Sequence, residues 1–187
     1  IVTQTIYDRE NRVSEILRDG LSTEQRSYDP AGNLRFLTDA NQNTSSFEYD
    51  ERNLLIAENR PLAAITRYEY DVMGDAIVEQ DPENRRTISV YDLRRRKKSQ
   101  TRQRDDGPDE TVSYDYDGNG NQILWQPPEG NRTEFVYDKA DRLIRVINAA
   151  GILDLETGYS YDRADNRLSQ TDANQHTTVF EYDELNR

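Results

Sequence analysis

A tyrosine–aspartate pair recurs nine times along this chain of 187 residues, and this repeat constrains the fold more than any other feature. The pairs begin at Tyr7, Tyr28, Tyr49, Tyr70, Tyr91, Tyr116, Tyr137, Tyr161 and Tyr182. Successive tyrosines are 21 residues apart, except for one interval of 25 and one of 24. A fixed period of this size is typical of arrays of small units that stack on one another. The repeat therefore favours a structural role over a catalytic one.

The residues that follow each tyrosine predict a tight turn. The next residue is always aspartate: Asp8, Asp29, Asp50, Asp71, Asp92, Asp117, Asp138, Asp162 and Asp183. The fourth residue after the tyrosine is Gly, Asn or Asp in eight repeats, including Gly32, Gly74 and Gly120. Aspartate accepts hydrogen bonds from nearby backbone N–H groups, and Gly, Asn and Asp tolerate a left-handed backbone. We expect a type I turn closed by a bulge, and a strained or differently shaped turn at Arg95.

The residues before each tyrosine predict a half-buried strand. Six repeats carry a second aromatic residue two positions earlier, as in Phe47 and Tyr49, usually with a polar residue between them. Residues two apart lie on one face of a strand. Turn-forming clusters such as Asp39–Asn43 follow each returning strand. The sequence therefore predicts an all-β fold, in which tandem hairpins of about 21 residues form a curved antiparallel sheet.

We expect residues 1–187 to form one continuous array that is cut at both ends. The two longer intervals predict longer surface loops near residues 102–110 and 148–158.

Composition excludes several classes of function. The formal net charge is −12, which disfavours binding to nucleic acid phosphates. Cysteine is absent, which excludes disulfides and thiolate metal sites, and no apolar run is long enough for a membrane span. Only 34% of the residues are hydrophobic, but the 12 tyrosines and 4 phenylalanines recur at regular positions, which argues against disorder. We expect no cofactor and no catalytic residue.

The Y-D-x-x-[G/N/D] units resemble RHS repeats, also called YD repeats, over essentially the whole chain. Four of them continue with arginine, at Arg12, Arg96, Arg142 and Arg187. The family includes bacterial polymorphic toxins, the shells of insecticidal toxin complexes, type VI secretion effectors and the teneurins. The resemblance implies a sheet that spirals into a hollow shell around a toxic C-terminal domain. It also implies a secreted or cell-surface protein, with the remaining repeats, the cargo domain and a toxin-complex or secretion component as partners.

The chain departs from the full-length family pattern, because it lacks the box that carries the self-cleaving aspartates. The dipeptides Asp29-Pro30 and Asp81-Pro82 are interpreted as parts of turns. The resemblance therefore implies a shell segment that encapsulates a C-terminal toxin or effector, without proteolysis or toxicity of its own. The alternative is an extracellular adhesion or carbohydrate-binding module, with ligands held by the two longer loops. No sequence motif supports an enzyme.

One segment imitates a calcium-binding loop. Asp115, Asp117 and Asn119 are followed by Gly120, like the start of an EF-hand. The twelfth position is Gln126, where the EF-hand needs a bidentate glutamate, and the same residues are in phase with the repeat turns. A structural turn is the favoured interpretation, with calcium binding as the alternative.

Other conspicuous residues have structural interpretations. His176 is the single histidine and lies in a predicted turn, while the many carboxylates include no isolated catalytic pair. The basic run Arg94–Lys98 is expected to form part of a strand pair that balances nearby acids, with a partner-binding patch as the alternative. Trp125 is expected to fill the sheet, with a carbohydrate platform as the alternative. Cut sheet edges predict self-association of the isolated segment, which light scattering can measure.

Overall fold

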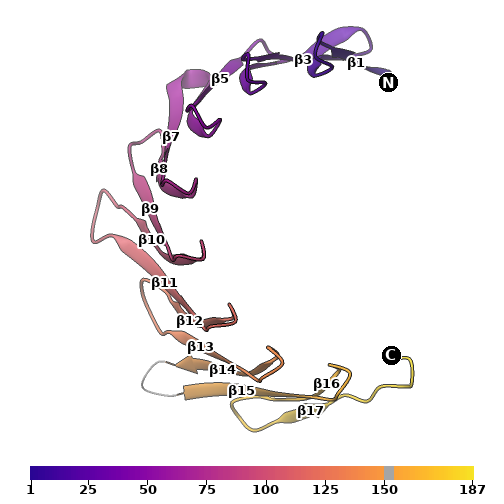
Figure 1. Ribbon diagram of the computed structural model, residues 1–187, viewed down its shortest axis with the longest axis vertical. Coiled ribbons are helices and arrows are strands. Elements are labelled where there is room, and N and C mark those ends of the chain that lie inside the picture. Colours follow the sequence, from indigo (N-terminus) through magenta and orange to yellow (C-terminus); the bar gives the residue numbers. More distant parts are fainter. Residues whose placement is uncertain (150–153) are drawn as a thin grey trace. The chain divides into compact units, whose positions relative to one another are not determined.

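The computed structural model describes residues 1–149 and 154–187, which form an all-β fold (Figure 1). The chain divides into two compact units, one of Ile1–Ser89 with Arg102–Pro108, and the other of Val90–Thr101 with Asp109–Arg187. Strands β9 (Arg86–Tyr91) and β10 (Lys97–Arg102) contribute residues to both units. The predicted all-β class built of antiparallel hairpins is confirmed.

In unit 1, each strand from β1 to β8 pairs in antiparallel fashion with the strand that follows it. The strands that lie wholly in this unit are β1 (Thr3–Tyr7), β2 (Val13–Arg18), β3 (Leu21–Tyr28), β4 (Leu34–Asp39), β5 (Thr44–Tyr49), β6 (Leu55–Arg60), β7 (Ala64–Tyr70) and β8 (Ala76–Gln80). A short 3-10 turn, η1 (Pro61–Ala63), joins β6 to β7.

Unit 2 repeats the same meander, since each strand from β11 to β16 pairs with the next one in antiparallel fashion. Its strands are β11 (Glu110–Tyr116), β12 (Gln122–Gln126), β13 (Thr133–Tyr137), β14 (Leu143–Ala149), β15 (Asp154–Tyr161), β16 (Arg167–Thr171) and β17 (Thr177–Val179). The last repeat departs from the expected strand pattern, because β17 ends at Val179, before Phe180 and Tyr182.

Seven of the repeated tyrosines lie at a β-bulge. In the hairpin of β5 and β6, Glu48 is opposite Ala57 and Tyr49 is opposite Leu55, so that Ile56 has no partner of its own. The same shift occurs beside the corresponding tyrosines of β1, β3, β7, β11, β13 and β15. A bulge bends the strand and re-aims the side chains beside it. These seven hairpins therefore enter their Tyr–Asp turns in the same way.

The two segments that we expected to be longer loops differ from each other in structure. Residues 103–109 connect β10 to β11, within the segment expected near 102–110. In the segment expected near 148–158, β14 extends to Ala149 and β15 begins at Asp154, so strand pairing continues on both sides. The remaining residues of that segment, 150–153, lie outside the described residues.

The units have almost no enclosed core. Among the side chains that the structure describes, Val78 is the one buried apolar group, with 8% exposure. The described chain exposes 13329 Å², whereas a compact monomer of 21.8 kDa exposes roughly 9,000 Å². Each unit consists of one sheet, and no described residue forms a second layer over it. Stability must therefore come largely from hydrogen bonds and from contacts between neighbouring strands.

Candidate functional site: the tyrosine–aspartate turn ladder

The Tyr–Asp turns share one set of backbone hydrogen bonds. In the first turn, the N–H of Asp8 donates to the carbonyl of Arg12 at 2.8 Å, and the N–H of Asn11 donates to the carbonyl of Asp8 at 3.1 Å. Asn11 has a positive φ of 62°. This geometry is a type I turn closed by one residue in the left-handed region. The turn directs the chain back along the sheet after only a few residues.

The aspartate carboxylate stabilises the turn by accepting hydrogen bonds from within it. One oxygen of Asp8, Oδ1, accepts hydrogen bonds from the backbone N–H groups of Glu10 at 3.0 Å and Arg12 at 2.9 Å. The other oxygen, Oδ2, accepts from the Arg12 guanidinium Nε at 2.7 Å. A carboxylate is needed because a neutral amide offers one acceptor oxygen in place of two. These bonds explain why aspartate occupies this position in every repeat.

Hydrogen bonding lowers the pKa of most of these aspartates. The largest cause in each case is a donor of the residue four positions later, such as the backbone N–H of Arg12 for Asp8 or the side-chain amide of Asn121 for Asp117. The pKa is lowered in this way for Asp8, Asp29, Asp50, Asp92, Asp117, Asp138, Asp162 and Asp183. The turns are therefore built around ionised carboxylates that are already engaged.

Our expectation that the turn at Arg95 has a different shape is wrong. Arg95 has a φ of 64°, its N–H donates to the carbonyl of Asp92 at 2.9 Å, and the N–H of Asp92 donates to Arg96 at 2.9 Å. The turn is thus the same as at Asn11. Left-handed backbone costs a residue with a side chain about 1–2 kcal/mol, and the fixed hydrogen bonds of the turn impose it here.

Tyrosine hydroxyls connect five of the turns to the preceding repeat. The hydroxyl of Tyr28 donates to the carbonyl of Val13 in the preceding repeat at 2.8 Å. Four further tyrosines bond in the same way to the residue six positions after the preceding tyrosine: Tyr70 to Leu55, Tyr116 to Lys97, Tyr161 to Leu143 and Tyr182 to Arg167. Burial raises the pKa of Tyr70 and Tyr116, which keeps these donors protonated. We call this series of linked turns the turn ladder.

Arginine strengthens three links of the turn ladder. The guanidinium of Arg12 lies 4.5 Å from the ring centre of Tyr28, that of Arg96 lies 4.5 Å from Tyr116, and that of Arg142 lies 5.1 Å from Tyr161. Each of these arginines also bonds the aspartate of its own turn. The residue five positions after the tyrosine therefore completes one turn and covers the ring of the next.

The same position forms a second kind of link when it is not stacked on a ring. The side-chain amide of Asn33 donates to the Asn53 oxygen, and that of Asn166 donates to the Asn186 oxygen, both at 2.8 Å. Asn121 donates likewise to Asp141 at 2.7 Å. Our sequence interpretation missed this link. Arg or Asn occupies the fifth position in seven repeats, a pattern that was visible in the sequence: Arg12, Asn33, Arg96, Asn121, Arg142, Asn166 and Arg187.

Three turns at the opposite ends of the strands use the same device. Asp39, Asp81 and Asp172 each accept backbone N–H bonds from the second and fourth residues after them. His176 lies in the last of these turns, where its Nδ1 is 3.2 Å from Oδ2 of Asp172. Its side chain is 81% exposed. It therefore occupies the turn position filled by Asn43 in the earlier repeat.

The three residues of the calcium hypothesis have separate partners. Asp115 forms an ion pair with Lys98 at 3.1 Å, and Asp117 accepts the hydrogen bonds of its turn. The Asn119 amide donates to Asp141 at 2.7 Å. No group of three or more metal-ligating side chains occurs among the residues that the structure describes. The geometry gives these residues roles in the sheet and the turn ladder.

The basic run balances nearby acids as expected, since Arg96 bonds Asp92 and Lys98 bonds Asp115, but it lies only partly in a strand, and the tryptophan is more exposed than expected. Arg94–Arg96 lie in a Tyr–Asp turn and only Lys97 and Lys98 begin β10, because the turn rule at Asp92 outweighs strand pairing. The guanidinium of Arg94 donates to the carbonyl of Gly118. Trp125 lies on β12 but keeps 38% exposure, because no second layer covers the sheet.

Comparison with known proteins supports this geometry. The RHS Repeat family matches residues 28–65 and 116–153. These two segments of the chain therefore have the sequence of RHS repeats. Among curated proteins, none is similar enough in sequence to count as a relative.

Solved structures of TcdB2-TccC3 are similar in fold to this chain. One that lacks the hypervariable C-terminal region has a TM-score of 0.71 at 15% identity, over 95% of this chain and 12% of that one. TcdB2-TccC3-TEV has a TM-score of 0.63 at 14% identity, over 99% of this chain and 12% of that one. The Photorhabdus luminescens Tc holotoxin pore has a TM-score of 0.55 at 15% identity, over 95% and 13%. The chain thus spans about an eighth of these proteins. None of its described helices could cross a membrane.

Proposed function

We propose that this RHS-repeat chain is a structural wall segment of a shell that encapsulates a C-terminal toxin or effector domain for secretion or delivery. The turn ladder carries the proposal, because it joins successive repeats by hydrogen bonds and stacking without needing a packed core. A wall must be thin and continuous, and a single sheet reinforced at its turns meets both needs. The likeness in fold to TcdB2-TccC3 supports the same assignment.

The proposed role is non-catalytic. Each Tyr–Asp turn directs its carboxylate at donors within the turn, as Asp138 does with Arg142. The proposed partners are further repeats, the enclosed cargo domain and a toxin-complex or secretion component, at a secreted or cell-surface location. One of the similar TcdB2-TccC3 structures lacks a hypervariable C-terminal region, and a cargo that varies behind a constant wall is consistent with that description.

Growth of producing cells tests the proposal. We would express three proteins separately, each from the same promoter: the complete protein that carries these repeats, the segment downstream of Arg187, and the repeats alone. We expect arrest from the downstream segment only. If neither the downstream segment nor the complete protein slows growth, and the complete protein binds intact cells, the adhesion hypothesis replaces the shell. Inactivating the downstream segment by a frameshift controls for the burden of expression.

A further inference from the structure

The turns of the ladder differ in the residue five positions after the tyrosine. Where this residue is arginine and stacks, its guanidinium covers the ring of the next tyrosine and bonds the aspartate of its own turn. After Tyr28 the residue is Asn33, whose side-chain amide donates to Oδ2 of Asp29 at 3.0 Å and to the Asn53 oxygen at 2.8 Å. Among the residues that the structure describes, no guanidinium lies over the ring of the next tyrosine, Tyr49.

A hollow of about 340 Å³ opens beside this uncovered ring. Its lining residues all belong to unit 1 and are Asp29, Arg35, Phe47, Glu48, Tyr49 and Ile56. The aspartate of one turn and the ring of the next tyrosine are the two groups that a stacked arginine contacts elsewhere in the turn ladder. The hollow therefore offers the contacts of such an arginine without containing one. We call it the Asp29 hollow.

The charges around the Asp29 hollow favour a cation. Asp29 and Glu48 contribute two carboxylates, whereas Arg35 contributes one guanidinium, which stacks at 5.4 Å on the ring of the residue that follows it. Burial, together with the carboxylates of Asp29 and Glu58, raises the pKa of Tyr49. The ring thus lies in a negative field that a guanidinium placed over it would offset.

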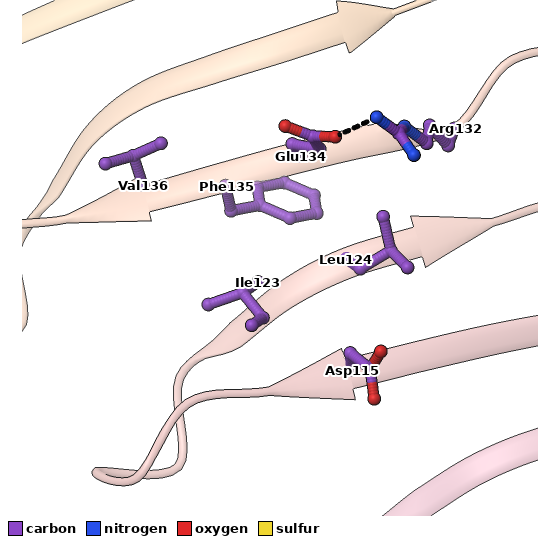
Figure 2. Close-up of a pocket in the computed structure, with 7 residues that line it drawn as sticks. All are labelled: Asp115, Ile123, Leu124, Arg132, Glu134, Phe135 and Val136. Atoms are coloured by element: carbon purple, nitrogen blue, oxygen red, sulfur yellow. Dashed lines mark ion pairs between the residues drawn. The ribbon is translucent and has the colours of Figure 1, made fainter.

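The corresponding hollow in unit 2 measures about 380 Å³ and has a different lining (Figure 2). Apolar side chains, Ile123 and Val136, occupy two positions that are charged in the Asp29 hollow. Its carboxylates already have partners, since Glu134 pairs with Arg132 at 2.7 Å, as Figure 2 shows, and Asp115 pairs with a lysine at 3.1 Å. We call it the Ile123 hollow, and it provides an internal control.

We propose that the Asp29 hollow binds an arginine side chain of a partner polypeptide, in the manner of the chain's own stacked arginines. A planar guanidinium can stack on the Tyr49 ring and donate hydrogen bonds to Asp29 at the same time, whereas a lysine ammonium is a point charge. The net charge of −12 attracts a positively charged partner. An arginine within a polypeptide brings no carboxylate of its own, unlike free arginine. This inference does not depend on the proposed shell function.

Methyl NMR tests the proposal on this chain, because a different isoleucine lines each hollow. The δ1-methyl group of Ile56 reports on the Asp29 hollow, and that of Ile123 reports on the Ile123 hollow. Both groups would be labelled with carbon-13 and assigned with Ile56→Val and Ile123→Val. The probe is a pentapeptide of four glycines around one arginine, with blocked termini. Peptides with citrulline or lysine in place of arginine are the controls, since citrulline has nearly the same shape without the charge.

We expect the arginine peptide to shift the Ile56 signal until it saturates and to leave the Ile123 signal in place. The citrulline peptide should bind about tenfold more weakly or worse, because the cation–π contact and the charge-assisted hydrogen bonds are lost. Equal shifts from the arginine peptide and either control, equal shifts at both isoleucines, or no shift at Ile56 overturn the proposal. If free arginine acts at the same concentrations as the peptide, a small guanidinium compound is the occupant and the assignment to a polypeptide is refuted.

A substitution within the turn ladder provides an independent test. Asn33→Arg supplies the arginine that Arg12 supplies one turn earlier, so it should fill the Asp29 hollow and abolish the Ile56 response to the peptide. Asn166→Arg is the matched control, because it makes the same change of charge at an equivalent turn in unit 2 and should leave that response intact. An unchanged response in Asn33→Arg, or an equal loss in both variants, contradicts the site. Circular dichroism verifies that the strands of both variants are intact.

Discussion

Among single residues, the repeated tyrosines combine two contributions that can be separated by substitution. The ring of Tyr161 lies under the Arg142 guanidinium, and its hydroxyl reaches a backbone carbonyl of the preceding repeat. Any aromatic residue would retain the stacking with the guanidinium, whereas the hydrogen bond requires the tyrosine hydroxyl. This explains why phenylalanine appears two positions before the pair but not within it.

Tyr161→Phe removes only the hydrogen bond to Leu143, which measures 2.8 Å. The carbonyl of Leu143 loses this donor, and the free energy of unfolding should fall by about 1 kcal/mol. Urea unfolding followed by circular dichroism measures the change. Tyr159→Phe is the matched control, because Tyr159 lies two residues earlier on β15 and is not one of the tyrosines that donate to the preceding repeat. Equal losses in the two variants would remove the hydroxyl link from the turn ladder.

Gly120→Ala tests the left-handed position. Gly120 has a φ of 108°, and a new Cβ would lie 3.7 Å from Nη1 of Arg96, so the strain would come from the backbone and not from a clash. We expect a loss of about 1–2 kcal/mol in unfolding free energy. Gly118→Ala in the same turn, where φ is not positive and no atom is within 4 Å, should cost less. The reverse order in urea unfolding would contradict the turn assignment.

Among elements, the hairpin depends on ionised carboxylates. In the folded protein, the pKa values of Asp8, Asp138 and the similar aspartates lie below the value of about 3.9 that applies to the unfolded chain. Their stabilisation is therefore complete above that pH and is lost as the pH falls through the folded pKa values. Urea midpoints should be flat from about pH 7 to 5 and decrease steeply below about pH 4.

Asp138→Asn provides the control for that pH dependence. The variant loses one acceptor oxygen facing Arg142, so it should be less stable than the parent at neutral pH. Because one titrating group is gone, its stability should fall less between neutral and acid pH. A parallel loss in both proteins would show that other carboxylates determine the acid transition.

The sequence predicted the hairpins and missed their connections for a physical reason. The period and the Asp8-to-Asn11 spacing are local signals, so the turns could be recognised from each repeat alone. The link from Asn33 to Asn53 joins residues 20 apart, and it requires knowing which repeats are adjacent in space. The set of side chains that share one face across two strands was also hidden, because the bulge beside each tyrosine, as at Tyr137, shifts the alternation between one strand and the next.

At the scale of the whole molecule, charge governs which partners can approach. The net charge of −12 opposes polyanions, and the basic run is already engaged, as Arg96 bonds Asp92 at 2.7 Å and Lys98 bonds Asp115 at 3.1 Å. We expect no binding to duplex DNA in fluorescence anisotropy at physiological salt. DNA binding that is present in the parent and lost when Arg94–Lys98 are replaced by glutamine would make the basic run a partner patch.

The tyrosine link has one further consequence. The hydroxyl of Tyr28 reaches back 15 residues and that of Tyr116 reaches back 19, yet the two hydrogen bonds measure 2.8 and 2.9 Å. Extra residues are thus absorbed away from the Tyr–Asp turns, and residues 103–109 supply such a connection between β10 and β11. Mutation can therefore lengthen this connection while the spacing of the turns is preserved. A tag or a small folded domain inserted between Asp106 and Gly107 should be accepted there, whereas an insertion between Tyr116 and Asp117 should not.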